Sequence, residues 1–381
     1  MGLSASGDEL VRVTIGGAAS GHLAWAEGER VTLPRQVLTA LGWTDRRGTD
    51  TPLTLPAQLP PLPSGISLQL RDRAAFTNTP PVSSRLPVSY QRVPGWLRAA
   101  IAGALGRWQR RSVDVWGRFP GFPLDLSADF LADLERGTPL PSRPAPVVLS
   151  HDIDSPEGLR NLVDAFLPIE EAVGSRSVNF IVPCAWPIDH GLVAEARARG
   201  HQIGVHGHDH SNRSPFADTS ERRERLDAAR AFIDRYEARG YRAPSLLRTR
   251  ALLRDLSSRY AYDSSIPTSG GLFPVPNNGC ATARPFTIEG ITELPVSMPR
   301  DGSLRFLGYS PAEIAAIWRD CAARIARAHG VVVLLTHCER RFSGTRAMLD
   351  AYQRTLAFLR ESGGFTFCAA SDVAAASREV A

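Results

Sequence analysis

The sequence offers few cysteines and no spacing of them that would organise a fold. Its 381 residues contain five cysteines, scattered and without a CxxC pair, so no disulfide framework is indicated. It also lacks the run of about 18 apolar residues that spanning a bilayer requires, so no transmembrane segment is predicted. The opening residues, MGLSASGDELVRV, do not combine a basic start with an apolar core. A secretory signal is therefore not recognised, and a cytoplasmic location is expected.

Charge of one sign is not concentrated in any run. The chain carries 44 basic and 39 acidic residues, which gives a net charge of +5. The basic residues are arginine-rich and lysine-poor, a bias that we attribute to genome composition. A basic balance favours anionic partners in general, but no Lys/Arg run with interleaved aromatics marks a nucleic-acid footprint. Nucleic acid is therefore not an expected partner.

Proline-rich stretches divide the chain. The length exceeds that of one ordinary domain, so two units are expected. One proline-rich stretch covers residues 52–63 and another covers residues 139–146. Proline fixes φ and withholds a donor, so both are predicted to be extended linkers or loops. A regular α/β pattern begins directly after the second, which predicts an N-terminal unit over 1–140 and a second unit over 146–381.

Strands and helices alternate throughout the second unit. Five short apolar runs are predicted as strands: Val147–Ser150, Val178–Val182, Gln202–Val205, Val331–Leu335 and Phe365–Ala369. Apolar residues recur at helical spacing between them, as in the helix that Leu226 and Tyr236 share and that we expect to end at Gly240. Another helix opens with the capping box at Ser310. An open doubly wound sheet and a closed barrel both fit this alternation, and both gather functional residues at the carboxyl ends of their strands.

Metal-binding side chains follow three of the predicted strands. Asp152 and Asp154 follow the first, and His337 ends the most apolar one. Three histidines stand within five residues after another strand, at positions 206, 208 and 210. Neutral imidazole is the commonest ligand for zinc-like ions. Loop acids and surface histidines without a role are the alternative, but their shared place at strand ends favours one metal site.

Six short motifs follow one another along the second unit. In order, they are Ser-His-Asp-Ile-Asp at 150–154, His-x-x-x-His at 206–210, Arg-Ala-Pro at 242–244, Tyr-Asp-Ser-Ser at 262–265, Glu-Leu-Pro-Val at 293–296 and Leu-Thr-His at 335–337. This series resembles the polysaccharide deacetylase superfamily, carbohydrate esterase family four, in its branch with an HDxD first motif. The resemblance covers about 230 residues from Pro146 onward. It implies a distorted (β/α) barrel of seven or eight strands, here with an additional N-terminal α+β region.

The resemblance also implies roles for individual residues. Asp154, His206 and His210 are expected to bind one divalent metal ion, with zinc as the expected ion. Asp152 corresponds to the general base, Arg242 to the cation that orients this base, and His337 to the general acid. The backbone N–H of Ser245, directly after Pro244, corresponds to a group that helps to hold the oxyanion.

Some positions depart from the family pattern. Ile153 separates two aspartates that are usually adjacent. Ser245 and Leu246 replace an aromatic residue and a glycine after the third motif, which changes the expected pocket wall. The usual fourth motif is missing, and Glu293 is expected to support His337 at the substrate site. His208 has no family role, and we expect it to be a hydrogen-bonding residue at the rim rather than a ligand.

The N-terminal unit holds one long amphipathic segment, residues 96–111. Its apolar face comprises Leu97, Ile101, Ala104, Leu105 and Trp108, and its arginines lie largely off that face. We expect a helix that packs this face on the barrel, with peripheral contact to a membrane surface as the alternative.

The sequence therefore predicts a metal-dependent hydrolase that removes an N-acyl group, with acetyl as the expected group, from an amino sugar or glycan precursor. Hydrolysis of a non-sugar amide or formamide on the same barrel is the nearest alternative. A non-catalytic glycan-binding protein is another, although it would be free to lose the five metal and acid–base residues. A bound stoichiometric metal ion discriminates the enzymes from the binding protein.

Overall fold

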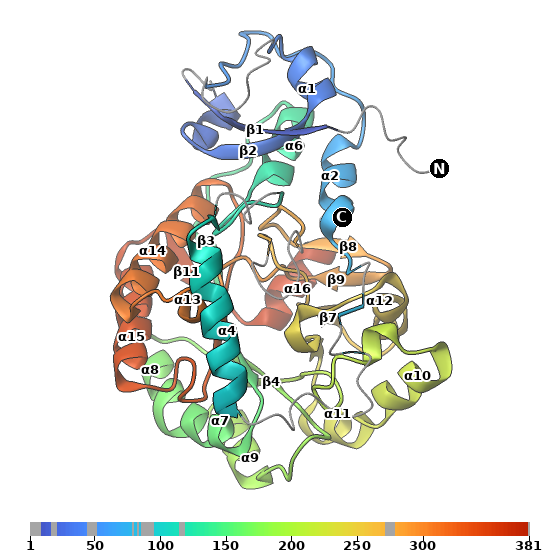
Figure 1. Ribbon diagram of the computed structural model, residues 1–381, viewed down its shortest axis with the longest axis vertical. Coiled ribbons are helices and arrows are strands. Elements are labelled where there is room, and N and C mark those ends of the chain that lie inside the picture. Colours follow the sequence, from blue (N-terminus) through green and yellow to red (C-terminus); the bar gives the residue numbers. More distant parts are fainter. Residues whose placement is uncertain are drawn as a thin grey trace.

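The computed structural model describes residues 9–16, 21–43, 52–77, 80–81, 84, 95–113, 119–270 and 279–379. Figure 1 shows a small N-terminal unit above a larger α/β body, with one long helix crossing the front of that body. The predicted separation near residues 140–146 falls at the chain segment that enters the larger body, where strand β3 (Ala145–Ile153) begins.

One curled, largely parallel sheet forms the centre of the larger body. Its strands are hydrogen-bonded in the order β10-β3-β4-β5-β6-β7-β9-β8, and β11 also pairs with β3. Every pairing in it is parallel except that of β8 with β9. The other bounds are β4 (Val178–Ile181), β5 (Gln202–Val205), β6 (Gly240–Tyr241), β7 (Tyr262–Asp263), β8 (Phe286–Ile288), β9 (Ile291–Glu293), β10 (Val332–His337) and β11 (Phe365–Phe367). This arrangement confirms the predicted barrel class over the open doubly wound sheet.

The gap between β9 and β10 is bridged by single hydrogen bonds rather than by a strand ladder. The amide of Met298 donates to the carbonyl of Val333 at 3.2 Å, and the amide of Val333 donates to Oγ of Ser297 at 2.8 Å. The Ser297 hydroxyl donates in turn to the carbonyl of Val331 at 2.7 Å. The segment that follows β9 therefore brings residues 297–301 beside the carboxyl end of β10.

Helices cover the outside of the sheet, as the apolar spacing predicts. They are α7 (Pro156–Asn161), a π-helical turn (Leu162–Phe166), α8 (Leu167–Ala172), α9 (His190–Ala198), α10 (Thr219–Asp227), α11 (Arg230–Tyr236), α12 (Arg250–Ser257), α13 (Asp301–Phe306), α14 (Pro311–Arg327), α15 (Arg346–Glu361) and α16 (Ala370–Glu379). The predicted capping box of α14 is present in full, because the side chains of Ser310 and Glu313 each accept a hydrogen bond from the backbone N–H of the other residue. The predicted stop at Gly240 is wrong. The single helix predicted over Leu226 and Tyr236 is also wrong, because α10 ends at Asp227 and α11 begins at Arg230. The second helix ends at Tyr236, where Glu237 takes the left-handed conformation, and Gly240 starts β6.

The N-terminal unit is tied to the barrel by buried polar contacts. It consists of the antiparallel strands β1 (Leu10–Thr14) and β2 (Arg30–Pro34), a 3₁₀ turn, and helices α1 (Arg35–Ala40), α2 (Ile66–Ala74) and α6 (Ser127–Arg136). In α6, the carboxylate of Asp133 accepts a hydrogen bond from the indole N–H of Trp25 at 2.9 Å. It also accepts hydrogen bonds from Nη1 and Nη2 of Arg284 in the barrel. Glu29 pairs with Arg324 of α14. One continuous hydrophobic core runs through both units.

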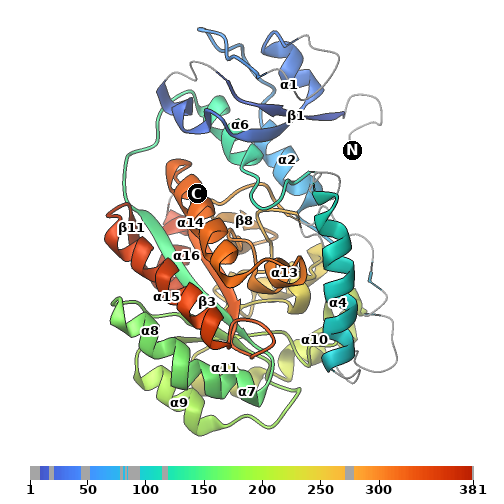
Figure 2. The same cartoon turned by 60° about the vertical axis from the view of Figure 1, so that its left-hand side comes forward.

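Helix α4 (Gly95–Arg110) lies on the barrel, but with its faces reversed from our expectation. Among the α4 residues whose burial the structure describes, Ala102, Gly106 and Gln109 are buried. A Cβ on Gly106 would lie 1.9 Å from the carbonyl oxygen of Phe306 in α13. The backbones of the two helices therefore approach closely, which only small residues allow. The predicted apolar face is exposed instead, with Ile101 at 52% and Trp108 at 54%. Figure 2 shows α4 at the outer edge of the molecule, outside α13.

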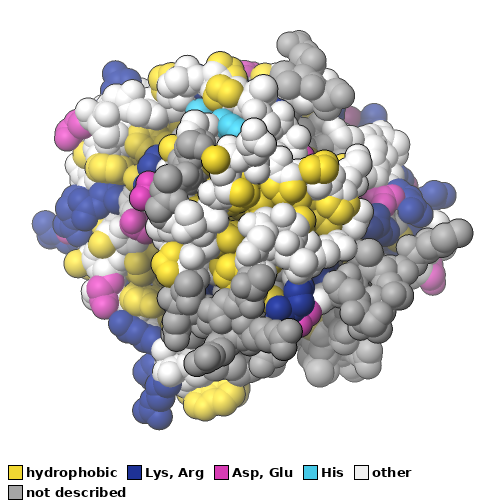
Figure 3. Space-filling view, turned by 90° about the horizontal axis from the view of Figure 1, so that it is seen from above, with side chains coloured by type: hydrophobic (Ala, Val, Ile, Leu, Met, Phe, Trp, Pro, Cys, Tyr) yellow, Lys and Arg dark blue, Asp and Glu magenta, His cyan; other side chains and the backbone are white. Residues whose placement is uncertain are grey.

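Figure 3 views the molecule from the N-terminal unit. Basic side chains gather mainly around the periphery, while hydrophobic side chains occupy much of the central area. Among the described residues, none of the helices has both the length and the hydropathy that crossing a membrane demands.

Candidate active site

The register of two neighbouring strands brings the acid–base residues together. In the parallel pair of β10 with β3, Thr336 lies opposite His151, and His337 lies opposite Asp152. The next strand over, β4, pairs with the other edge of β3, and β5 follows it. The carboxyl ends of β10, β3 and β5 therefore share one rim of the barrel, where the sequence placed the chemistry.

Asp154, His206 and His210 form a group able to hold a metal ion. One ligand atom from each lies within 4.8 Å of the others. The Nε2 atoms of both histidines are 3.5 Å from Oδ1 of Asp154. This Oδ1 atom is buried and has no hydrogen-bond partner among the described residues. A buried carboxylate oxygen that faces two imidazoles fits a divalent cation, because the ion would satisfy all three atoms.

Backbone contacts orient the first histidine as a ligand. Nδ1 of His206 lies 3.0 Å from the carbonyl oxygen of Arg242, to which it donates, so Nε2 carries the free lone pair. Burial lowers the pKa of His210 despite the opposing charge of Asp154, which favours the neutral imidazole that ligation requires. Burial raises the pKa of Asp154, but the two histidines outweigh burial and bring the pKa below its ordinary value.

Left-handed backbone conformations shape the histidine turn. Gly207 has φ +67°, and a Cβ on it would lie 2.5 Å from the ring of Pro244. His210 has φ 57°. Between them, Nδ1 of His208 lies 3.7 Å from Oδ1 of Asp209, and the interaction with this carboxylate raises the pKa of His208 to about 9. His208 therefore lies outside the metal group. Its expected role as a hydrogen-bonding residue at the rim stays a prediction, because Nδ1 of His208 has no hydrogen-bond partner among the described residues.

Asp152 is buried against an arginine that is itself fully enclosed. Nη1 of Arg242 donates to Oδ1 of Asp152 at 3.0 Å. The guanidinium is fixed by the carbonyl and the hydroxyl of Ser264, at 2.9 and 2.8 Å, and lies 4.2 Å from the ring centre of Phe180. Burial raises the pKa of Asp152, yet the charges of His206 and Arg242 outweigh it, so the pKa falls below its ordinary value. The other oxygen, Oδ2, lies 3.7 Å from Nε2 of His206, on the metal side.

His337 is held by a carboxylate that the sequence analysis missed. Nδ1 of His337 lies 2.8 Å from Oδ1 of Asp301, and its backbone N–H donates to Oδ2 at 2.8 Å. The hydroxyl of Ser343 donates to the same Oδ2 at 2.7 Å. Burial lowers the pKa of His337, but the charge and hydrogen bond of Asp301 outweigh it and raise the pKa to about 9. The ring of Phe342 lies 4.5 Å from the imidazole, centre to centre.

Glu293 does not provide this support, and our expectation for it is wrong in that respect. Its Oε1 accepts the amide of Ile266 at 2.8 Å, and its side chain is fully buried beside Asp263. Asp301 lies eight positions further along, at the start of α13. The sequence gives one weak signal for Asp301, which is its place in the segment that follows β9 and precedes β10. The contact with His337 depends on how residues 297–301 cross to β10, which no motif encodes.

Asp263 and Glu293 are two fully buried carboxyl groups with raised pKa values. Ser265 donates to Oδ1 of Asp263 at 2.6 Å. The remaining oxygens, Oδ2 of Asp263 and Oε2 of Glu293, find no other partner among the described residues. Burial, followed for Glu293 by the charge of Asp263, raises the pKa of both groups. A single proton held between them would satisfy both oxygens.

Glu339 is a second residue that the sequence analysis missed. Its Oε1 accepts the amide of Asp154 at 3.0 Å and the hydroxyl of Ser155 at 2.8 Å. Burial and the adjacent charge of Asp154 raise the pKa of Glu339 to about 7. Its position two residues after His337 is the only hint in the sequence. Glu339 thus ties the loop that carries Asp154 to the end of β10.

The segment after Arg242 presents a backbone amide. Pro244 packs over Gly207, and Ser245 takes the left-handed conformation with φ 53° and ψ 16°. The amides of Leu246 and Leu247 donate to the carbonyls of Ala243 and Pro244. No acceptor within the described ranges takes the N–H of Ser245. This amide is therefore available to an oxyanion.

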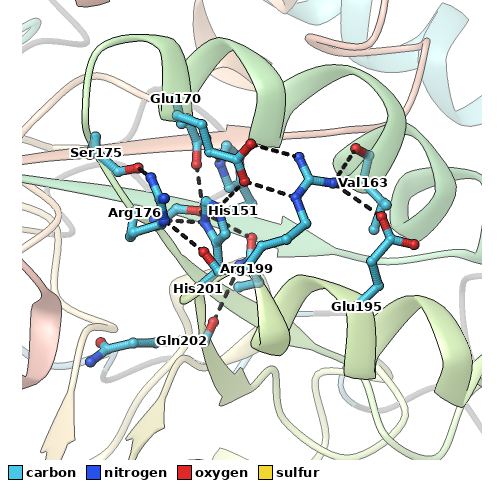
Figure 4. Close-up of polar contacts among 12 residues, drawn as sticks. His151, Val163, Glu170, Ser175, Arg176, Glu195, Arg199, His201 and Gln202 are labelled. Carbon is cyan, nitrogen blue, oxygen red and sulfur yellow. Dashed lines mark hydrogen bonds and ion pairs between the residues drawn. The ribbon is translucent and has the colours of Figure 1, made fainter.

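The histidine of the first motif has a structural role beneath the rim. His151 is fully buried, with Nδ1 2.8 Å from the hydroxyl of Thr336 and Nε2 2.5 Å from Oε1 of Glu170. Figure 4 shows this contact beside His201. Nδ1 of His201 accepts a hydrogen bond from the backbone N–H of Ser177, so this ring nitrogen carries no proton. The buried pair of His151 and Glu170 holds the carboxyl-terminal part of β3, which carries Asp152 and leads to Asp154.

Comparisons with known proteins identify the fold. No family model and no curated protein sequence matches the chain. A solved structure described as a polysaccharide deacetylase from Mycobacterium smegmatis matches with a TM-score of 0.51 at 18% identity, over 63% of this chain and 92% of that one. The chitin deacetylase from Colletotrichum lindemuthianum matches with a TM-score of 0.40 at 16% identity, over 62% and 91%. On the first of these matches, the barrel of this chain has the polysaccharide deacetylase fold.

Proposed function

We propose that this protein is a metal-dependent hydrolase that removes an N-acyl group, with acetyl as the expected group, from an amino sugar or glycan precursor. The observation that carries the proposal is the convergence of the metal group Asp154, His206 and His210 with Asp152 and His337 at one rim of a deacetylase barrel. A scaffold alone would leave the substrate open, because one fold hosts many reactions. The support comes from the arrangement of these side chains.

Asp154, His206 and His210 would hold one divalent ion, and zinc suits this mixed nitrogen and oxygen set. Such an ion supplies Lewis acidity, which lowers the pKa of a water molecule and polarises an amide carbonyl. The protein residues then divide the two proton transfers between them. Asp152 is kept ionised by Arg242, so it can accept the proton of the attacking water at Oδ2.

The remaining steps use the opposite side of the site. As the water oxygen bonds to the acyl carbon, the N–H of Ser245 donates to the developing oxyanion. His337 is protonated because Asp301 holds its Nδ1–H, and it gives its Nε2 proton to the departing nitrogen. The C–N bond then breaks to leave a carboxylic acid and an amine.

The test is a screen of metal-loaded protein for release of acetate or formate. N-acetylated amino sugars, their nucleotide-linked forms and simple formamides are the three substrate groups. Metal content is measured on the same sample. Turnover of an N-acetyl sugar by a preparation with one ion per chain supports the proposal. Turnover of formamides alone supports the non-sugar amidase, and a chain that binds no divalent ion contradicts both.

A further inference from the structure

Exposed apolar side chains concentrate on one helix. Among the described residues, large hydrophobic side chains are strongly exposed at five positions, and four of them belong to α4: Leu97 at 36%, Ile101 at 52%, Leu105 at 37% and Trp108 at 54%. Their spacing of four, four and three residues places them along one face. Scattered exposed leucines need no explanation, but a continuous stripe of this kind marks an interaction surface.

The helix is anchored in a way that keeps this stripe outward. Ala102, Gly106 and Gln109 form the opposite, buried face, and Gly106 lies against the backbone of Phe306. Nη1 of Arg110 donates to the carbonyl of Gly308 at 2.9 Å. The guanidinium of Arg110 also lies 4.1 Å from the ring centre of Tyr309. Rotating the helix to bury the stripe would lose these contacts.

The charge of the helix selects the kind of partner. Its sequence, GWLRAAIAGALGRWQR, contains arginine but no aspartate or glutamate. Arg107 and Arg111 are exposed beside the stripe. Arg110 is partly offset by an ion pair with Glu313 at 3.2 Å. An outward apolar face flanked by arginine, without acidic residues, is complementary to a lipid surface that carries negative headgroups.

We infer that α4 is a membrane-docking helix that lies in the interface of a bilayer containing anionic lipids. The stripe Leu97, Ile101, Leu105 and Trp108 enters the boundary between headgroups and acyl chains, and the arginines contact the headgroups. The helix rests on α13, which begins at Asp301, the partner of His337.

The inference is tested by co-sedimentation of the full chain with two kinds of vesicle. One kind is phosphatidylcholine alone, and the other adds phosphatidylglycerol. The double variant Ile101→Glu/Leu105→Glu places two charges in the stripe. Leu68→Glu, at the only other strongly exposed large hydrophobic residue described, with 53% exposure, is the matched control. Circular dichroism checks that each variant is folded.

We expect the wild type and Leu68→Glu to pellet with the anionic vesicles. The stripe variant should lose about tenfold or more of its bound fraction, because charges replace apolar contacts in the interface. Wild-type protein that stays in the supernatant with both vesicles overturns the inference. So does a stripe that instead mediates dimers, seen as a change from dimer to monomer in the variant. Neither outcome bears on hydrolase activity, which is measured separately.

Discussion

Asp152 and His337 lie directly opposite each other in the register of β3 and β10. Each is held by its own partner of opposite charge: Asp152 by Arg242 at 3.0 Å and His337 by Asp301 at 2.8 Å. The ends of the two strands therefore place an ionised aspartate, the proposed general base, opposite a protonated histidine, the proposed general acid. This pairing makes each group's role separable by substitution.

Asp152→Asn should abolish turnover and leave metal binding intact. Asparagine keeps an oxygen for Arg242 but cannot accept the proton of the attacking water. Loss of a general base typically costs about 100- to 10,000-fold in rate. Turnover and metal content are measured on the same preparation. Near-normal activity of this variant on an amide that the wild type hydrolyses would refute the assignment of the base.

His206→Ala should lose both metal and activity. The substitution removes one of the three ligand atoms and leaves Oδ1 of Asp154 facing the imidazole of His210 alone. His208→Ala is the matched control, because His208 belongs to the same turn but pairs with Asp209 instead. Metal content by mass spectrometry should fall for the first variant and stay at the wild-type level for the second. Equal loss in both would place the ion elsewhere.

Asp301→Asn should shift the titration of His337 to lower pH. Asp301 raises the pKa of His337 to about 9, so the proton that the imidazole donates is present below that pH and is lost above it. Without the carboxylate charge, the pKa should fall toward its ordinary value of 6.5, and the alkaline limb of activity should move the same way. Imidazole proton shifts in NMR report this directly. Ser343→Ala removes a hydrogen bond to Asp301 but keeps the charge, so its titration should change little.

Glu293→Gln should weaken the loss of stability that accompanies a rise of pH above the ordinary carboxyl pKa of 4.5. Both carboxyl pKa values are raised by burial, so the folded state binds a proton at this pair more tightly than the unfolded state does. The stability that this proton contributes is present at low pH and is lost as pH rises through the folded pKa. Glutamine can donate to Asp263 without a titrating proton. Melting temperatures are compared across pH, with Glu289→Gln, at an exposed ion pair with Arg250, as the control.

The sequence predicted the frame of the site well because that frame is local. Apolar runs fixed β3, β5 and β10, and parallel pairing brings their carboxyl ends together, so Asp154, His206 and His337 could be placed on one rim in advance. The contacts that were missed join distant segments. Asp301 contacts His337 because the segment after β9 runs beside the carboxyl end of β10. Nothing in the local sequence around Asp301 predicts that path.

The helix α4 was predicted at the right place but with the wrong face inward. Hydrophobic periodicity assumes that the apolar face is buried. Here Gly106 and Ala102 permit a closer backbone approach to α13 than leucine or isoleucine would allow, and this geometry decided the orientation. The predicted cytoplasmic location and the identity of the metal remain predictions.

The polar contacts of α6 have a consequence for any attempt to excise the catalytic unit. A fragment that starts at residue 146 would strip Asp133 from Arg284 and Asp129 from the amide of Ala283, and it would uncover the apolar surface under Phe130. Severing a largely buried charge pair can cost about 3–5 kcal/mol, a large share of the stability of an ordinary domain. The linker that reads as a boundary in the sequence is thus no safe place to cut, and recombinant work should keep both parts of the chain.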